Sequence, residues 1–122
     1  MTSLDARPKA YLKRGCPFCL KLRIFLTEAG MAEVLDYVVF EDGDETHLAV
    51  RARMERAGRQ PGFPAVEFEP GRFETGADAL IGRFAQQGGV DPGSLALLNY
   101  YTGGVFKAFG EMYMELKNLK SS

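Results

Sequence analysis

The sequence has no tryptophan, one histidine and only two cysteines among its 122 residues. A structural zinc ion in a protein usually has four Cys or His ligands. Because Cys16, Cys19 and His47 supply at most three, we expect no metal site within one chain. We expect His47 instead to be a solvated surface residue on a polar helix.

Long apolar segments are also absent. No run of 18 uninterrupted apolar residues occurs, and residues 1–8 lack the apolar stretch of a signal peptide. We therefore expect a cytoplasmic protein without a membrane partner. In that reducing compartment, a pair of cysteines more often binds a metal or reacts than forms a structural disulfide.

The charged residues form no long basic run. The chain has 15 Lys and Arg against 16 Asp and Glu, and its formal net charge is −1. A protein that follows a phosphate backbone needs clustered cations, so we do not expect a nucleic-acid partner. The hydrophobic content of 46% and the charged content of 25% are those of an ordinary globular protein with a buried core.

What the sequence does contain is the segment Cys16-Pro17-Phe18-Cys19, which holds both of its cysteines. It follows a short apolar segment and opens a helical pattern, with Pro17 at the first helical position. Two cysteines at this spacing form a dithiol that can close into a disulfide, and a helix N-terminus stabilises the thiolate of the first. The segment therefore indicates a redox function.

The order of elements predicts an α/β fold. Apolar spacing and turn residues indicate strand 10–13, helix 17–29, strand 34–40, helix 45–57, strands 65–68 and 72–74, and helix 76–86. Strand–helix alternation favours parallel pairing in the first half, and the Pro70-Gly71 turn favours a hairpin in the second. We expect a four-stranded mixed sheet flanked by helices, with strand 34–40 buried. On helix 45–57, which is mostly polar, we expect a solvated face formed by Arg51, Arg53 and Arg56.

Residues 87–93 form a glycine-rich break, and residues 94–122 after it have a helical pattern. An apolar stripe recurs every seven residues at Leu98, Val105, Met112 and Leu119. Gly103-Gly104 and Gly110 weaken that helix, so we expect a kink or two helices. Further apolar residues widen the stripe, namely Leu97, Tyr101, Phe106, Tyr113 and Met114. We expect a domain over residues 1–87 and a helical extension over 88–122 that packs on the domain or forms a homodimer contact.

Three segments together resemble the glutaredoxin family of thioredoxin-fold proteins. They are Lys13-Arg14-Gly15-Cys16-Pro17-Phe18-Cys19, then Gly58-Arg59-Gln60 followed by Phe63-Pro64, and then Glu74-Thr75-Gly76-Ala77-Asp78. The resemblance covers roughly residues 9–86. It implies a thioredoxin-like fold in which the Phe63–Pro64 peptide bond is cis and lies beside the dithiol.

The resemblance also implies a glutathione-dependent thiol–disulfide oxidoreductase. Cys16 is then the nucleophile and Cys19 the resolving thiol, with Lys13 and Arg14 nearby favouring the thiolate. Glutathione serves as co-substrate, with no bound cofactor, and the other substrate is a disulfide-bonded or glutathionylated protein. The glutathione-binding residues implied by the family are Lys13, Arg59, Gln60, Phe63, Pro64, Thr75, Gly76 and Asp78. Glutathione carries two carboxylates and one ammonium group, which suit cations, a helix N-terminus and an acid.

Several alternatives stay open at this point. The segment Glu74-Thr75 is also similar to the Glu-Ser of glutathione transferase N-terminal domains, which bind the same tripeptide. The chain could bind glutathione or a partner without turnover, using the dithiol as a redox sensor. Cys16 could act alone on glutathionylated substrates, and some glutaredoxins bind an iron–sulfur cluster between two copies. Among these, the glutathione-dependent oxidoreductase is the function that we expect.

Overall fold

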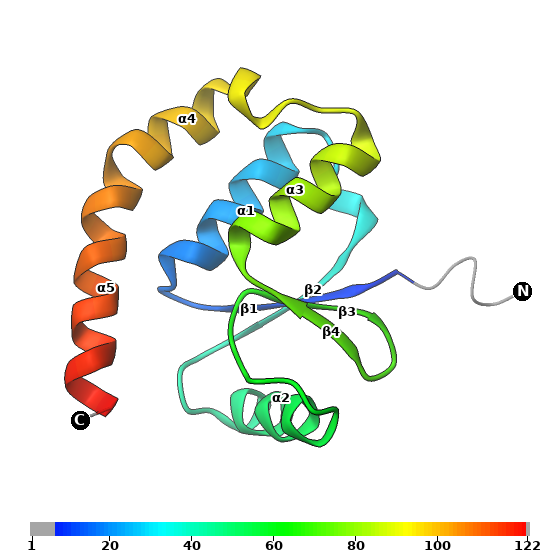
Figure 1. The fold of residues 1–122 in the computed structure, drawn as a ribbon, viewed down its shortest axis with the longest axis vertical. Coiled ribbons are helices and arrows are strands. Elements are labelled where there is room, and N and C mark those ends of the chain that lie inside the picture. Colours follow the sequence, from blue (N-terminus) through cyan, green and yellow to red (C-terminus); the bar gives the residue numbers. More distant parts are fainter. Residues whose placement is uncertain (1–6, 122) are drawn as a thin grey trace, which may run out of the picture.

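The computed structural model describes residues 7–121, so the first six residues of the expected 1–87 domain lie outside it. Four strands form one mixed sheet in the order β2-β1-β3-β4 (Figure 1). They are β1 (Lys9–Lys13), β2 (Asp36–Phe40), β3 (Ala65–Glu69) and β4 (Arg72–Thr75). Strand β1 pairs parallel with β2 and antiparallel with β3, which pairs antiparallel with β4. The prediction of a mixed four-stranded sheet is confirmed.

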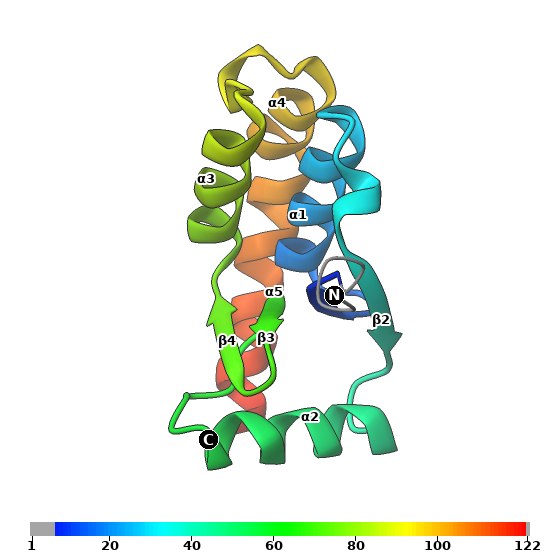
Figure 2. The same ribbon diagram turned by 90° about the vertical axis from the view of Figure 1, so that its right-hand side faces the viewer.

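Helices lie on both faces of this sheet. They are α1 (Pro17–Glu28), α2 (Glu45–Arg56), α3 (Ala77–Gly88), α4 (Ala96–Gly103) and α5 (Val105–Ser121), with short 3-10 turns η2 (Ala32–Val34) and η3 (Pro92–Ser94). In Figure 1, α1 and α3 lie on one side of the sheet and α2 on the other. Figures 1 and 2 both show α5 running from the level of α1 to the level of α2.

The main core lies between the sheet and the α1–α3 pair. Leu22, Phe25 and Leu26 of α1 are fully buried because they recur at the helical spacing that lines up one face. Leu80 and Phe84 of α3 pack into the same cluster. A smaller apolar cluster lies on the α2 side and contains Tyr11, Phe40, Val50, Met54, Ala65 and Phe73.

The expectation of a buried strand over residues 34–40 is wrong in two respects. The strand begins at Asp36, because Ala32–Val34 forms a 3-10 turn. In addition, β2 lies at the edge of the sheet, and Val39 is 46% exposed. The run of β-branched residues indicates a strand correctly, but burial depends on how many neighbours the strand has, and β1 and β3 take the two inner places.

The expectation that Arg53 belongs to a solvated face is also wrong. Its guanidinium donates to the Tyr11 hydroxyl at 3.1 Å and forms an ion pair with the Glu67 carboxylate. Glu67 is buried, and it accepts further hydrogen bonds from the Tyr11 hydroxyl and the Gly71 N–H, both at 2.9 Å. These contacts attach α2 to β1 and β3. Arg51 and Arg56 are exposed, as expected.

The C-terminal segment forms two helices that meet at Gly103 and Gly104, as the glycines predict. Helix α4 is attached to both ends of α1. The Glu28 carboxylate accepts hydrogen bonds from the N–H groups of Leu97 and Leu98, at 2.8 and 2.9 Å, and the Tyr101 hydroxyl donates to the Pro17 carbonyl at 2.8 Å. Residues 88–121 therefore pack on the part of the same chain that contains the sheet, through the contacts between α4 and α1.

Replacing Glu28 tests this attachment. The Glu28→Ala variant should lose about 1–2 kcal/mol of unfolding free energy, because two N–H groups at the start of α4 lose their acceptor. Urea denaturation measures the loss, and Glu55→Ala, at an exposed position of α2, is the matched control. Equal stability of the two variants would contradict the assignment of Glu28 as a cap for α4.

Across residues 7–121, none of the helices combines the length and the apolar character that crossing a bilayer requires.

Candidate functional site

The two cysteines meet at the start of α1. Gly15, with φ of +77°, forms the turn that leads from β1 into the helix, and Cys16 is the N-cap residue. The Cys16 Sγ accepts the Cys19 N–H at 3.4 Å, and the Cys19 Sγ accepts the Lys13 N–H at 3.4 Å. Both thiols are free, and the two residues are only 4% and 3% exposed.

The surroundings separate the acidities of the two thiols. A hydrogen bond from the Cys19 thiol, followed by the N–H groups of Cys19 and Phe18, lowers the pKa of Cys16 to about 6 in spite of burial. The same hydrogen bond and burial raise the pKa of Cys19. At neutral pH, Cys16 is therefore a thiolate and Cys19 a thiol that donates to it. This is the arrangement of a nucleophile next to a second, protonated cysteine.

The sequence-based expectation assigned part of this effect to Lys13 and Arg14. In the structure, the Lys13 ammonium pairs with Asp42 at 3.4 Å and the Arg14 guanidinium pairs with Glu41 at 2.7 Å. The largest influences that lower the pKa of Cys16 are instead hydrogen bonds from the Cys19 thiol and from the N–H groups of Cys19 and Phe18, with a smaller one from Tyr113. Local donors at the helix start therefore have a larger effect than the neighbouring cations.

The Phe63–Pro64 peptide bond is cis, which confirms the expectation for that bond. Pro64 is fully buried, and the Phe63 ring packs edge-on against Phe40 at a centroid distance of 4.8 Å. Phe63 also lines a hollow of about 450 Å³, together with Lys13 and Phe18. Two of the predicted glutathione-binding residues, Lys13 and Phe63, therefore lie around one concave surface.

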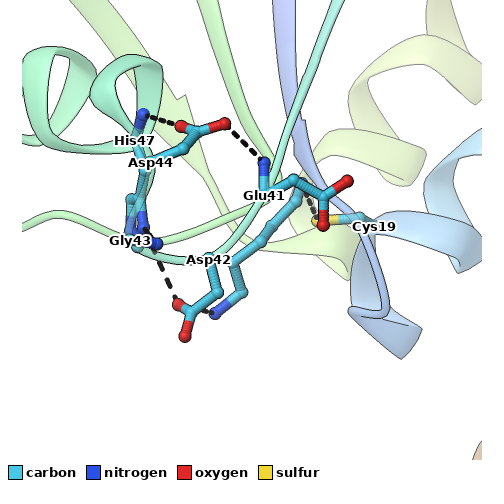
Figure 3. Close-up of polar contacts among 7 residues, drawn as sticks. Cys19, Glu41, Asp42, Gly43, Asp44 and His47 are labelled. Atoms are coloured by element: carbon cyan, nitrogen blue, oxygen red, sulfur yellow. Dashed lines mark hydrogen bonds and ion pairs between the residues drawn. The ribbon is translucent and has the colours of Figure 1, made fainter.

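His47 also lines this hollow, so the expectation that it is a solvated surface residue is wrong. It is 7% exposed, and its ring lies 5.4 Å from that of Phe63. Its Nδ1 accepts the Gly43 N–H at 2.8 Å, and its backbone N–H donates to the side chain of the N-capping Asp44 at 2.8 Å (Figure 3). Burial, with Lys13 nearby, lowers the pKa of His47. Asp44 in the sequence indicates where α2 begins, but the burial of the His47 ring depends on contacts with Phe40 and Phe63.

The other predicted glutathione-binding residues do not all lie around this hollow. Thr75 and Gly76 lie where β4 ends and α3 begins, and a side chain at Gly62 would come within 4.0 Å of Thr75. Asp78, in the first turn of α3, forms an ion pair with the Lys21 ammonium at 2.5 Å. Arg59 does not line the hollow beside Lys13; it lines a different one with the β3–β4 hairpin. Gln60 is exposed.

Aromatic residues of α4 and α5 complete the site, although the sequence analysis did not place them there. The Phe18 ring, between the two cysteines, packs edge-on against Phe106 at 5.3 Å and Tyr113 at 6.0 Å. The Lys13 ammonium lies 5.3 Å from the centre of the Tyr113 ring. A signal was present, because Tyr101, Phe106 and Tyr113 make the apolar stripe of residues 94–122 wider than one packing contact needs.

The residues from 7 to 121 that the structure describes contain no group of three His, Cys, Asp or Glu side chains placed to hold a metal ion. No family model, no curated protein and no solved structure matches the chain. Any function assigned to the chain therefore rests on the geometry of the dithiol and on the residues around it.

Proposed function

We propose that the chain is a glutaredoxin-like, glutathione-dependent thiol–disulfide oxidoreductase with a thioredoxin-like fold, acting in the cytoplasm. The observation that carries the proposal is the Cys16 thiolate at the N-terminus of α1, with a pKa of about 6, next to a protonated Cys19. The mixed sheet and the cis Phe63–Pro64 bond are compatible with that fold.

The proposed reaction begins when the Cys16 thiolate attacks a disulfide or a glutathionylated thiol. A mixed disulfide with Cys16 forms, and the substrate sulfur leaves with the electron pair of the broken bond. Cys19, after losing its proton, attacks the Cys16 sulfur and releases the second thiol. Two molecules of glutathione then reduce the Cys16–Cys19 disulfide and leave as oxidised glutathione.

For glutathione we propose the hollow lined by Lys13 and Phe63, with the Lys13 ammonium facing one carboxylate. The start of α3, at Thr75 and Gly76, offers N–H groups for the other carboxylate, and Asp78 offers an acid for the ammonium. Lys13 and Asp78 would exchange their present partners, Asp42 and Lys21, for the ligand. Arg59 has no role in this proposal because it lines a different hollow.

A coupled assay tests the proposal. NADPH consumption is followed with glutathione, glutathione reductase and a small glutathionylated disulfide. We expect turnover by the wild type, none by Cys16→Ser, and retained turnover by Cys19→Ser, because Cys16 alone can exchange with a glutathionylated thiol. If the wild type does not turn over although its dithiol still oxidises, the oxidoreductase proposal fails.

The burial of Cys16 favours a second candidate, a redox sensor without turnover. Closing the Cys16–Cys19 disulfide would remove the thiolate that Tyr113 of α5 contacts. In a sensor, oxidation should then change the hydrogen exchange of α5 or the oligomeric state, while the coupled assay shows no activity. Hydrogen-exchange mass spectrometry and light scattering of the two redox states distinguish this candidate from the enzyme.

A further inference from the structure

The nucleophilic thiol is covered by side chains from α4 and α5. Tyr101 is held against α1 by its hydrogen bond to the Pro17 carbonyl, and its ring lies 5.5 Å from that of Phe106. The Tyr113 ring packs on Phe18, and Tyr113 and Cys16 line the same hollow. Cys16 is consequently 4% exposed, although its low pKa suits a reactive group.

A second hollow gives access to the covered thiol. It has a volume of about 710 Å³, within the range of small-molecule sites, and Cys16 itself is part of its lining. Much of its other lining is apolar, and β2, α4 and α5 contribute Val39, Tyr101, Phe109, Met112 and Leu116 to it. The cations Lys13, Arg14 and Arg23 also line it. Lys13, Tyr113 and Leu116 line both this hollow and the one of about 450 Å³ that we propose for glutathione.

We propose that Cys16 reacts with small disulfides that carry an apolar substituent, and that α5 keeps disulfides on the surface of folded proteins away from it. The apolar substituent would occupy the hollow of about 710 Å³, where it removes apolar surface from water. A folded protein is too large for that space. Turnover of such disulfides rests on the proposed function, because it needs glutathione. The first reaction of the Cys16 thiol does not rest on it.

The first reaction balances without another reagent. The Cys16 thiolate forms a bond to one sulfur of the small disulfide, and the other sulfur leaves as a thiolate with the electron pair of the broken S–S bond. No electron is gained or lost overall, and no proton transfer is required. The step can therefore be measured once per molecule, without glutathione.

The test compares two probes that release the same thiopyridine. One is 2,2′-dithiodipyridine, which is small and apolar, and the other is a pyridyl disulfide attached to a polyethylene glycol chain of protein size. The rate of each probe is measured with Cys19→Ser, in which Cys16 is the only thiol. That rate is then divided by the rate of the same probe with free glutathione. For Cys16, the ratio of the small-probe rate to the large-probe rate should be at least about ten times the same ratio for free glutathione, because access limits thiol reactivity.

Variants in the same Cys19→Ser chain locate the cause. Tyr113→Ala should remove most of the preference, whereas Tyr113→Phe should keep it because the ring remains. Tyr100→Ala is the matched control, since Tyr100 is 81% exposed on α4. Met112→Trp, at an exposed position of the hollow, should slow the small probe, and circular dichroism checks that each variant is folded.

The outcomes separate this inference from the proposed function. Equal relative rates for the two probes would overturn the inference, even if the coupled assay detects turnover. A preference that Tyr113→Ala leaves unchanged in a folded chain would also overturn it. A preference that depends on Tyr113, without turnover in the coupled assay, would support the inference and reject the oxidoreductase proposal.

Discussion

Alkylation of Cys16 by iodoacetamide should follow one ionisation with a midpoint near pH 6. The thiolate is the reactive form, so the rate rises as the pH passes upward through the pKa of about 6 and is nearly constant by about pH 8. An ordinary cysteine, with a pKa of about 8.5, is still mostly protonated at pH 7. Mass spectrometry of the alkylated peptide as a function of pH measures the midpoint.

Two variants test the cause of this low pKa. Cys19→Ala removes the largest stabilising contact, the hydrogen bond from the Cys19 thiol, and should move the midpoint upward. In Cys16→Ser, the remaining Cys19 should react slowly at neutral pH because burial raises the pKa of its thiol and keeps it protonated. A wild-type midpoint above pH 8 would contradict the assignment of Cys16 as a thiolate at neutral pH.

Replacing Arg53 should cause a large loss of stability. In Arg53→Met, the buried Glu67 carboxylate keeps the Tyr11 and Gly71 donors but loses its cation. Breaking a buried ion pair costs about 3–5 kcal/mol, and we expect the lower end, about 3 kcal/mol, because the Arg53 side chain is partly exposed to water. Urea denaturation at pH 7 measures the difference, with Arg56→Met, exposed on the same helix, as control.

The loss of unfolding free energy in Arg53→Met should depend on pH. Burial opposes ionisation of Glu67, but hydrogen bonds from Gly71 and Tyr11 and the Arg53 cation overcome it and lower its pKa below the ordinary 4.5. A lowered carboxyl pKa stabilises the folded chain above pH 4.5, and this contribution disappears as the pH falls through the folded pKa. The difference between wild type and Arg53→Met should therefore shrink at low pH. A difference that is the same at pH 7 and pH 3 would contradict the ion-pair explanation.

The local features of this protein can be predicted from its sequence. Pro17 at the first position of α1 and the turn at Gly15 place Cys16 at a helix start, and these depend only on neighbouring residues. The predicted strand and helix bounds up to residue 88 agree with the structure within two residues, because apolar periodicity and turn residues act locally. The cis Phe63–Pro64 bond is expected from the family resemblance and not from local chemistry.

Which polar and aromatic residues meet depends on the tertiary fold. Arg53 and His47 both lie on a mostly polar helix, but the first meets the Glu67 carboxylate of β3 and the second packs beside Phe63. Tyr113 lies 97 residues after Cys16 in the chain, and it reaches the thiol because α5 returns past the N-terminus of α1. Such contacts join distant segments, so their energies depend on the whole arrangement of sheet and helices, which a local pattern does not contain.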